Sequence, residues 1–147
     1  MKLIGLDDKE YTISLSKYIN KPKVKNKSNL HIIAREILRQ LFPLDKIAEE
    51  VYLPGCSTAL YVDFLIASKK LACEVQGSQH TRHIRHFHKS KMDFAKAKAR
   101  DREKREILEL NNITLVELNY DDIGGWERAI INRYRKPSDG PSADQST

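Results

Sequence analysis

Apolar side chains recur at steps of three and four residues in three parts of the chain, and each part predicts a helix. The first runs from Leu30 and ends before Pro43, with Ser28 and Asn29 available as caps. The second is long and strongly basic and extends from about 87 to 111, and the third is a short segment at 126–134.

A two-residue alternation, in which Leu60, Val62, Phe64 and Ile66 and then Leu71, Cys73 and Val75 take every second position, predicts strands at 60–66 and 71–76 joined by a short turn at 68–70. Residues 50–54 are expected to form a preceding edge strand, and 113–118 a short buried one. The order is helix, three strands, helix, strand and helix. This order predicts a single α/β domain in which helices flank a central mixed β-sheet.

The two ends of the chain are expected to lie outside this core. Residues 1–27 are predicted to form an N-terminal accessory segment, with a hairpin followed by a basic connector around Pro22. The core domain is expected at 28–136. Residues 137–147 are rich in Pro, Ser, Asp and Gly and are predicted to be a disordered tail.

Composition places the protein among cytoplasmic globular proteins, or in the host cytoplasm if a phage encodes it. Its 147 residues suit one domain, and no apolar run approaches the roughly 20 residues that cross a bilayer, so no membrane partner is expected. The acids after Leu6 come too early for a secretory signal. Two cysteines without CxxC spacing indicate reduced thiols.

The net charge of +6 is concentrated in one segment. Residues 81–105 contain ten Lys or Arg and three acids, so the rest of the chain carries −1. Such a segment is typical of a surface that meets a polyanion, although a solvated helix face is the simpler alternative. The predicted DNA-binding side chains are Arg82, Arg85, His88, Lys89, Lys91, Lys96, Lys98, Arg102, Lys104 and Arg105.

Within the basic helix, Asp101 and Lys104 share one face with apolar residues. We expect Asp101 to be buried there and to pair with Lys104 or Arg105 along the same helix. This pair would help to fix the helix over the sheet.

Two acids interrupt otherwise apolar strands. Asp63 and Glu74 lie on neighbouring predicted strands, and pairing of these strands as a hairpin lets them face the same side. Two buried carboxylates repel each other unless a proton or a cation neutralises them. Mg²⁺ is the expected cofactor, with Mn²⁺ as a substitute. Gln76 faces the same side as Glu74 and could hold a water or contact a phosphate. The simpler alternative is that each acid caps a turn or pairs with a nearby lysine.

The motif formed by these residues resembles the PD-(D/E)XK nuclease superfamily. The similarity lies in Tyr61-Val62-Asp63-Phe64 followed by Leu71 to His80, which contains Glu74-Val75-Gln76 and Gly77-Ser78-Gln79-His80. These segments are similar to the very-short-patch-repair-like endonucleases and their small phage-type relatives. The resemblance covers roughly residues 30 to 120 and implies a restriction-endonuclease-like core.

The resemblance also implies roles for individual residues. Asp63 and Glu74 would bind the metal, with the Val75 carbonyl as a third ligand. Glu36 matches an acid that many members place on the helix before the core, as a metal ligand or catalytic residue; an ordinary surface glutamate is the alternative. The superfamily pattern usually ends in Lys, where this chain has Gln76. Three alternatives are open. Lys104 or Lys91 supplies the missing positive charge, Gln76 itself positions the water, or the enzyme is inactive.

Four of the five histidines lie between residues 80 and 88. His80 is expected at the mouth of the site, in contact with phosphate or in proton transfer. A zinc site is the alternative, although Cys56 and Cys73 do not supply a convincing ligand pattern.

The sequence therefore predicts a Mg²⁺-dependent DNA endonuclease without a small-molecule cofactor, as a monomer or a homodimer. A catalytically inactive nuclease fold that binds DNA is the alternative, and a zinc-stabilised interaction domain is a third class. Sequence preference, nicking against double-strand cutting, and RNA as a substrate stay open.

Overall fold

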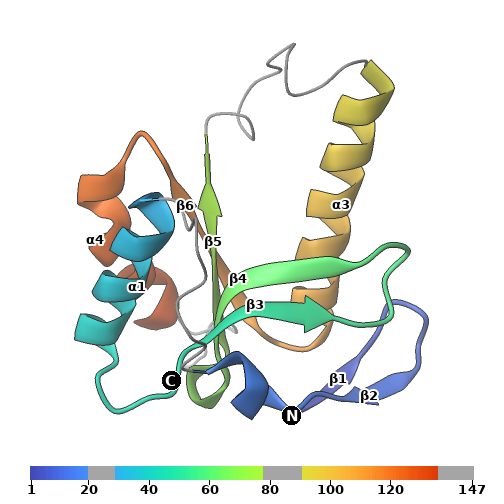
Figure 1. Cartoon of the computed structure of the whole chain (residues 1–147), viewed down its shortest axis with the longest axis horizontal. Coiled ribbons are helices and arrows are strands. Elements are labelled where there is room, and N and C mark those ends of the chain that lie inside the picture. The colour runs from blue at the N-terminus through green and yellow to red at the C-terminus, as the bar shows by residue number, and fades with distance from the viewer. Residues whose placement is uncertain (20–28, 78–90, 136–147) are drawn as a thin grey trace, which may run out of the picture.

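A four-stranded sheet forms the centre of the computed structural model, which describes residues 1–19, 29–77 and 91–135 (Figure 1). The strand order is β3–β4–β5–β6, with β3, β4 and β5 antiparallel and β6 parallel to β5. The strands are β3 (Ala48–Leu53), β4 (Leu60–Ile66), β5 (Leu71–Gln76) and β6 (Thr114–Asn119). All four lie within two residues of their predicted positions, so the mixed sheet is confirmed.

Helices cover both sides of this sheet. The helices are α1 (Asn29–Leu41), α3 (Lys91–Leu110) and α4 (Trp126–Arg135), with short 3₁₀ turns η1 (Leu15–Tyr18), η2 (Ala67–Lys69) and η3 (Ile123–Gly125). Leu38 of α1 and Trp126 of α4 pack in one buried cluster with Phe64 of β4. Ile107 of α3 packs in another with Val62 of the same strand. The sheet is thus a central layer between α1 and α4 on one side and α3 on the other (Figure 1).

The N-terminal hairpin β1 (Lys2–Ile4) and β2 (Glu10–Thr12) packs on the side of α3. The Asn111 side chain accepts a hydrogen bond from the backbone N–H of Ile4 at 2.7 Å and donates one to the Ile4 carbonyl at 2.9 Å. Gly5 approaches Gly55 of the β3–β4 loop so closely that a Cβ on Gly5 would lie 2.7 Å from the Gly55 Cα. The hairpin is therefore attached both to the end of α3 and to the β3–β4 loop.

The β3–β4 ladder is interrupted at one position. Glu49 pairs with Phe64 and Val51 pairs with Val62, whereas Glu50, opposite Asp63, has φ 51° in the left-handed region. A regular strand would turn Val62 and Phe64 to the same side, yet they belong to the two different clusters. The two strands of the hairpin therefore twist at Glu50 and Asp63, so that residues before and after this point face different sides. Strained backbone of this kind concentrates at functional positions.

A cluster of Glu49, His31 and Arg35 joins α1 to β3 on the side of the sheet opposite α3. Glu49 accepts hydrogen bonds from His31 at 2.8 Å and from Arg35 at 2.7 and 2.8 Å. The His31 ring stacks on Phe64 with 4.4 Å between centroids. Burial alone would raise the pKa of Glu49, but the hydrogen bonds from His31 and Arg35 lower it to about 2. Glu49 therefore stays ionised, and its contacts hold α1 against β3.

Most other boundaries also follow the sequence. The long helix ends at Leu110, before Asn112 with φ 58°, and its described part begins at Lys91. The predicted start near residue 87 lies outside the described residues. The basic connector at 20–28 and the predicted tail at 137–147 lie outside the described residues. Within the described ranges, no helix is long and apolar enough to cross a membrane.

Candidate functional site

Asp63 and Glu74 lie where β4 and β5 separate. Backbone pairing between the two strands ends at Phe64 and Cys73, one residue before the two acids. The Val75 N–H donates to Asp63 Oδ2 at 2.8 Å, and the Asp63 N–H donates to Glu74 Oε2 at 2.6 Å. Each carboxylate therefore bonds the backbone of the opposite strand, in place of the ladder. We call Asp63, Glu74 and Val75 the fork.

Glu74 is the most perturbed acid of the site. Its residue is 8% exposed, and its Oε1 accepts a hydrogen bond from Lys104 Nζ at 2.8 Å. Burial raises the pKa of the Glu74 carboxyl to about 7, and the Asp63 charge adds to the rise while Lys104 opposes it. The fork thus holds a carboxyl that carries its charge at considerable cost and that a cation would stabilise.

The partner of Lys104 corrects one prediction. Asp101 was expected to pair with Lys104 or Arg105 along the helix, but Lys104 pairs with Glu74 and Arg105 pairs with Glu117. Only 16% of the Lys104 side chain is exposed. Lys104 lies three and four residues before the buried Ile107 and Leu108, so it faces the sheet. The ion pair with Glu74 places Lys104 at the fork, where it could supply the positive charge that Gln76 lacks. Neither its charge nor its spacing to Asp101 had indicated this position.

Gln76 belongs to a second group beside the fork. Its Nε2 donates to Glu117 Oε2 at 3.1 Å, and the same oxygen accepts a hydrogen bond from Arg105 at 3.0 Å. Glu117 of β6 is the register partner of Glu74. Glu117 was not among the predicted site residues, although its alternation with the buried Val116 and Leu118 places it on the face of α3. This carboxylate sets the orientation of the Gln76 amide.

The structure does not bring Glu36 to the fork. Glu36 is exposed on α1, which packs against the side of the sheet opposite α3. Its ion pair in the described part of the chain is with Arg39, at 3.5 Å between NH1 and Oε2. The role that the resemblance implies for Glu36 stays a prediction.

The predicted DNA-binding residues fall into two sets. Lys91, Lys96, Lys98 and Arg102 are exposed along α3, and Arg105 is exposed while paired with Glu117. Lys104 is also in the described part of α3, but it is mostly buried and paired with Glu74. The remaining predicted contacts, with the catalytic candidate His80, lie outside the described residues: His80, Arg82, Arg85, His88 and Lys89.

The donor set at the fork suits a hard divalent cation. In residues 1–19, 29–77 and 91–135 no three His, Cys, Asp or Glu side chains come together as a metal-binding group. Mg²⁺ needs only one or two carboxylates because it keeps several waters, so Asp63, Glu74 and a backbone carbonyl fit it. Cys73 is unsuited to zinc, since its thiol is buried in the core and burial raises its pKa to about 12.

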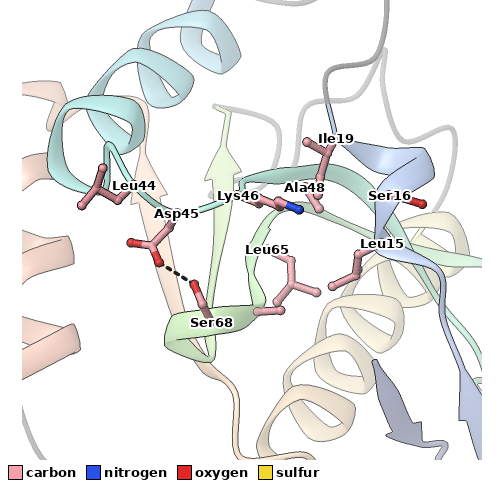
Figure 2. A pocket seen from close by; sticks show the side chains of 10 residues that line it. Leu15, Ser16, Ile19, Leu44, Asp45, Lys46, Ala48, Leu65 and Ser68 are labelled. Carbon is pink, nitrogen blue, oxygen red and sulfur yellow. Dashed lines mark hydrogen bonds between the residues drawn. The ribbon is translucent and has the colours of Figure 1, made fainter.

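A separate hollow of about 360 Å³ lies away from the fork, between η1 and the α1–β3 loop (Figure 2). Leu15, Leu65 and Ala48 form part of its wall. Its acid, Asp45, accepts a hydrogen bond from Ser68 at 2.6 Å. No residue of the fork lines this hollow, so it does not contribute to the candidate site.

Comparison with known proteins gives one partial similarity. The Uncharacterized protein 307L of Invertebrate iridescent virus 6 is 41% identical to this chain over 61 residues. The match covers 42% of this chain and 31% of that protein, so it spans about a third of the relative's length. No family model and no solved structure matches the chain.

The geometry defines a compact polar site on the face of the sheet covered by α3. Two carboxylates, an ammonium group and an oriented amide meet where β4 and β5 separate. Such a site can bind a divalent cation, offer a positive charge to an anion and accept a hydrogen bond from a water.

Proposed function

We propose that this protein is a Mg²⁺-dependent endodeoxyribonuclease with a restriction-endonuclease-like core of the PD-(D/E)XK type. The observation that carries the proposal is the fork, where Asp63 and the buried Glu74 meet between two diverging strands. A buried pair of carboxylates is costly, and a site keeps such a pair when a cation or a reaction needs it.

Asp63, Glu74 and the Val75 carbonyl would hold the cation, with Mn²⁺ as a substitute for Mg²⁺. When bound, the ion supplies Lewis-acid polarisation of the phosphodiester and lowers the pKa of a water. The residues of the fork keep this position away from bulk water, because Glu74 is almost fully buried.

Lys104 supplies the positive charge that Gln76 lacks. Its ammonium group lies 2.8 Å from Glu74 Oε1 and is mostly buried. With Glu74 committed to a cation, Lys104 becomes available to a phosphate oxygen and to the charge that develops on it. We therefore assign to Lys104 the role of the usual superfamily lysine, delivered from α3 instead of β5.

Gln76 takes a different part in this scheme. Because the Glu117 carboxylate only accepts hydrogen bonds, Gln76 presents its NH₂ group to it. The Gln76 Oε1 is then the end that can accept a hydrogen bond from the attacking water. The two functions of one lysine, charge and contact with water, are divided between Lys104 and Gln76.

An inactive nuclease fold that binds DNA is the second candidate, and the observation in its favour is Gln76 at the usual lysine position. Both candidates require the cations of α3, so loss of DNA binding on their removal does not separate them. Metal-dependent hydrolysis separates them, because only the enzyme has a use for the fork.

The test combines Mn²⁺ binding with cleavage of labelled duplex, single-stranded and branched DNA. The wild-type protein should bind Mn²⁺ and cut at least one substrate, whereas Asp63→Asn should lose both properties. Lys104→Met should bind Mn²⁺ and cut poorly. Glu109→Gln, an exposed acid near the end of α3, is the matched control and should behave as wild type. Cleavage in EDTA, or full activity in Asp63→Asn, would rule out the proposed site.

A further inference from the structure

Two exposed tyrosines lie on the β3–β4 hairpin close to the fork. Tyr52 and Tyr61 are register partners with ring centroids 5.6 Å apart and planes tilted by 56°. They are 39% and 52% exposed. Tyr61 precedes Asp63 by two residues on β4, so the ring lies one side-chain repeat from the proposed metal ligand.

Two contacts attach the tyrosine-bearing part of the β3–β4 hairpin to α3. Ser57 in the β3–β4 loop donates to Glu103, and Glu74 at the fork bonds the adjacent Lys104. Tyr61 therefore lies on the stretch of β4 between two attachments to the same turn of α3. This stretch of hairpin crosses the helix instead of running beside it (Figure 1).

The buried face of the hairpin is directed toward the C-terminal part of α3. Val62 and its partner Val51 pack in one cluster with Ile107 and Leu108. Side chains alternate along a strand, so Tyr52 and Tyr61 lie on the opposite face. That face is turned away from the C-terminal part of α3, and the N-terminal part of the helix extends past the hairpin (Figure 1).

This N-terminal part of α3 is exposed and basic. Residues 91–100 carry four Lys or Arg and one acid, and the four cations are all exposed. An aromatic pair beside exposed cations is the combination that binds unpaired nucleotides, since bases stack on the rings while phosphates contact the cations. A peptide or membrane partner is less well matched, because the rings form a small isolated pair rather than a broad apolar patch.

We propose that Tyr52 and Tyr61 form a stacking platform for unpaired bases, with the adjoining phosphates on α3. This inference rests on the proposed nuclease function and names its substrate class: DNA with single-stranded or unpaired nucleotides next to the scissile phosphate. Duplex DNA offers its phosphates to α3 but no free base faces to the rings. The platform therefore selects the substrate and leaves hydrolysis to the fork.

The test measures binding of fluorescent oligo-dT and of a duplex of equal length in Ca²⁺ or EDTA. Tyr61→Ala and Tyr52→Ala should weaken oligo-dT binding roughly tenfold or more and leave duplex binding nearly unchanged. Tyr61→Phe keeps the ring and should bind as wild type. Tyr134→Ala removes a tyrosine of similar exposure from α4, on the other side of the sheet, and should have no effect.

A purely structural role for the pair makes a different prediction. Cross-strand contacts also stabilise a hairpin, so each variant needs a urea unfolding midpoint beside its affinity. Tyr61→Leu keeps an apolar cross-strand contact without a ring. Leucine should not restore oligo-dT binding; if it does, or if the alanine variants bind oligo-dT normally, the platform is refuted.

The outcomes also separate this inference from the proposed function. Metal-dependent cleavage at the fork with tyrosine-independent binding would refute the platform and keep the nuclease. Tyrosine-dependent oligo-dT binding without any cleavage would refute the nuclease and keep the platform. Equal losses for duplex and oligo-dT, or no binding of either, would refute selection of unpaired bases.

Discussion

Replacing Glu74 by glutamine is expected to stabilise the metal-free protein at neutral and alkaline pH, although it disables the proposed site. Burial and the Asp63 charge raise the pKa of Glu74 from 4.5 to about 7, even with Lys104 beside it. The protonated carboxyl is therefore favoured by the folded state. Its stabilising effect is complete below pH 4.5 and is lost as the pH rises through 7.

The size of the effect follows from the shift. A difference between 4.5 and about 7 corresponds to about 3 kcal/mol in the free energy of unfolding, because one pKa unit is worth about 1.4 kcal/mol. Glutamine resembles the protonated acid and stays neutral. The Glu74→Gln variant should gain less than about 1 kcal/mol over wild type at pH 5 and about 3 kcal/mol at pH 8.

Urea unfolding in EDTA at pH 5 and pH 8, followed by the fluorescence of Trp126, measures this difference. The corresponding rise in melting temperature at pH 8 is on the order of 10 °C. Glu109→Gln is exposed and should show no pH-dependent gain. A Glu74→Gln protein that is less stable than wild type at pH 8, or whose advantage is the same at both pH values, would refute the reasoning.

Three further predictions concern Lys104, Glu49 and the cysteines. Lys104→Met should reduce kcat roughly a hundredfold with Mn²⁺ binding kept, as measured by single-turnover kinetics and calorimetry; unchanged kcat would remove Lys104 from the mechanism. Glu49→Gln should lower the free energy of unfolding by about 2 kcal/mol near pH 6 and by less at pH 2. The reason is that the wild-type carboxylate, with its pKa of about 2, loses its charge as the pH falls from 4.5 through 2. A loss that is the same at both pH values in urea unfolding would contradict this role of Glu49. Thiol reagents should label half-buried Cys56 in the native protein and Cys73 only on unfolding. Rapid labelling of both cysteines in the native protein would contradict the burial of Cys73.

The sequence predicted the elements well because local periodicity is strong where one face is buried. The two-residue alternation over β4 and β5 and the helical spacing before Pro43 each match the period of the element that forms there. The turn of the hairpin at Glu50 could not be predicted. It depends on the left-handed φ of a non-glycine residue that long-range packing imposes, and no local pattern marks such a residue.

The candidate site was predictable in part. Asp63 and Glu74 stood out because acids interrupt apolar strands, and their proximity followed from hairpin pairing. The partners of Lys104 and Gln76 did not follow, because each comes from an element distant in sequence. Spacing along α3 favoured Asp101 as the partner of Lys104. The packing of α3 on the sheet instead brings Lys104 to Glu74. Glu117 required the parallel register of β5 and β6.

Cleavage of supercoiled plasmid by the purified protein, with Mg²⁺ or EDTA and with Glu74→Gln in parallel, decides whether the fork is a nuclease site. The wild-type protein should cut only with Mg²⁺, and a Glu74→Gln protein whose fold and stability are intact should not cut. Persistent cutting by that variant, or no cutting of plasmid, branched or single-stranded DNA by a wild-type protein that binds DNA, would contradict this assignment.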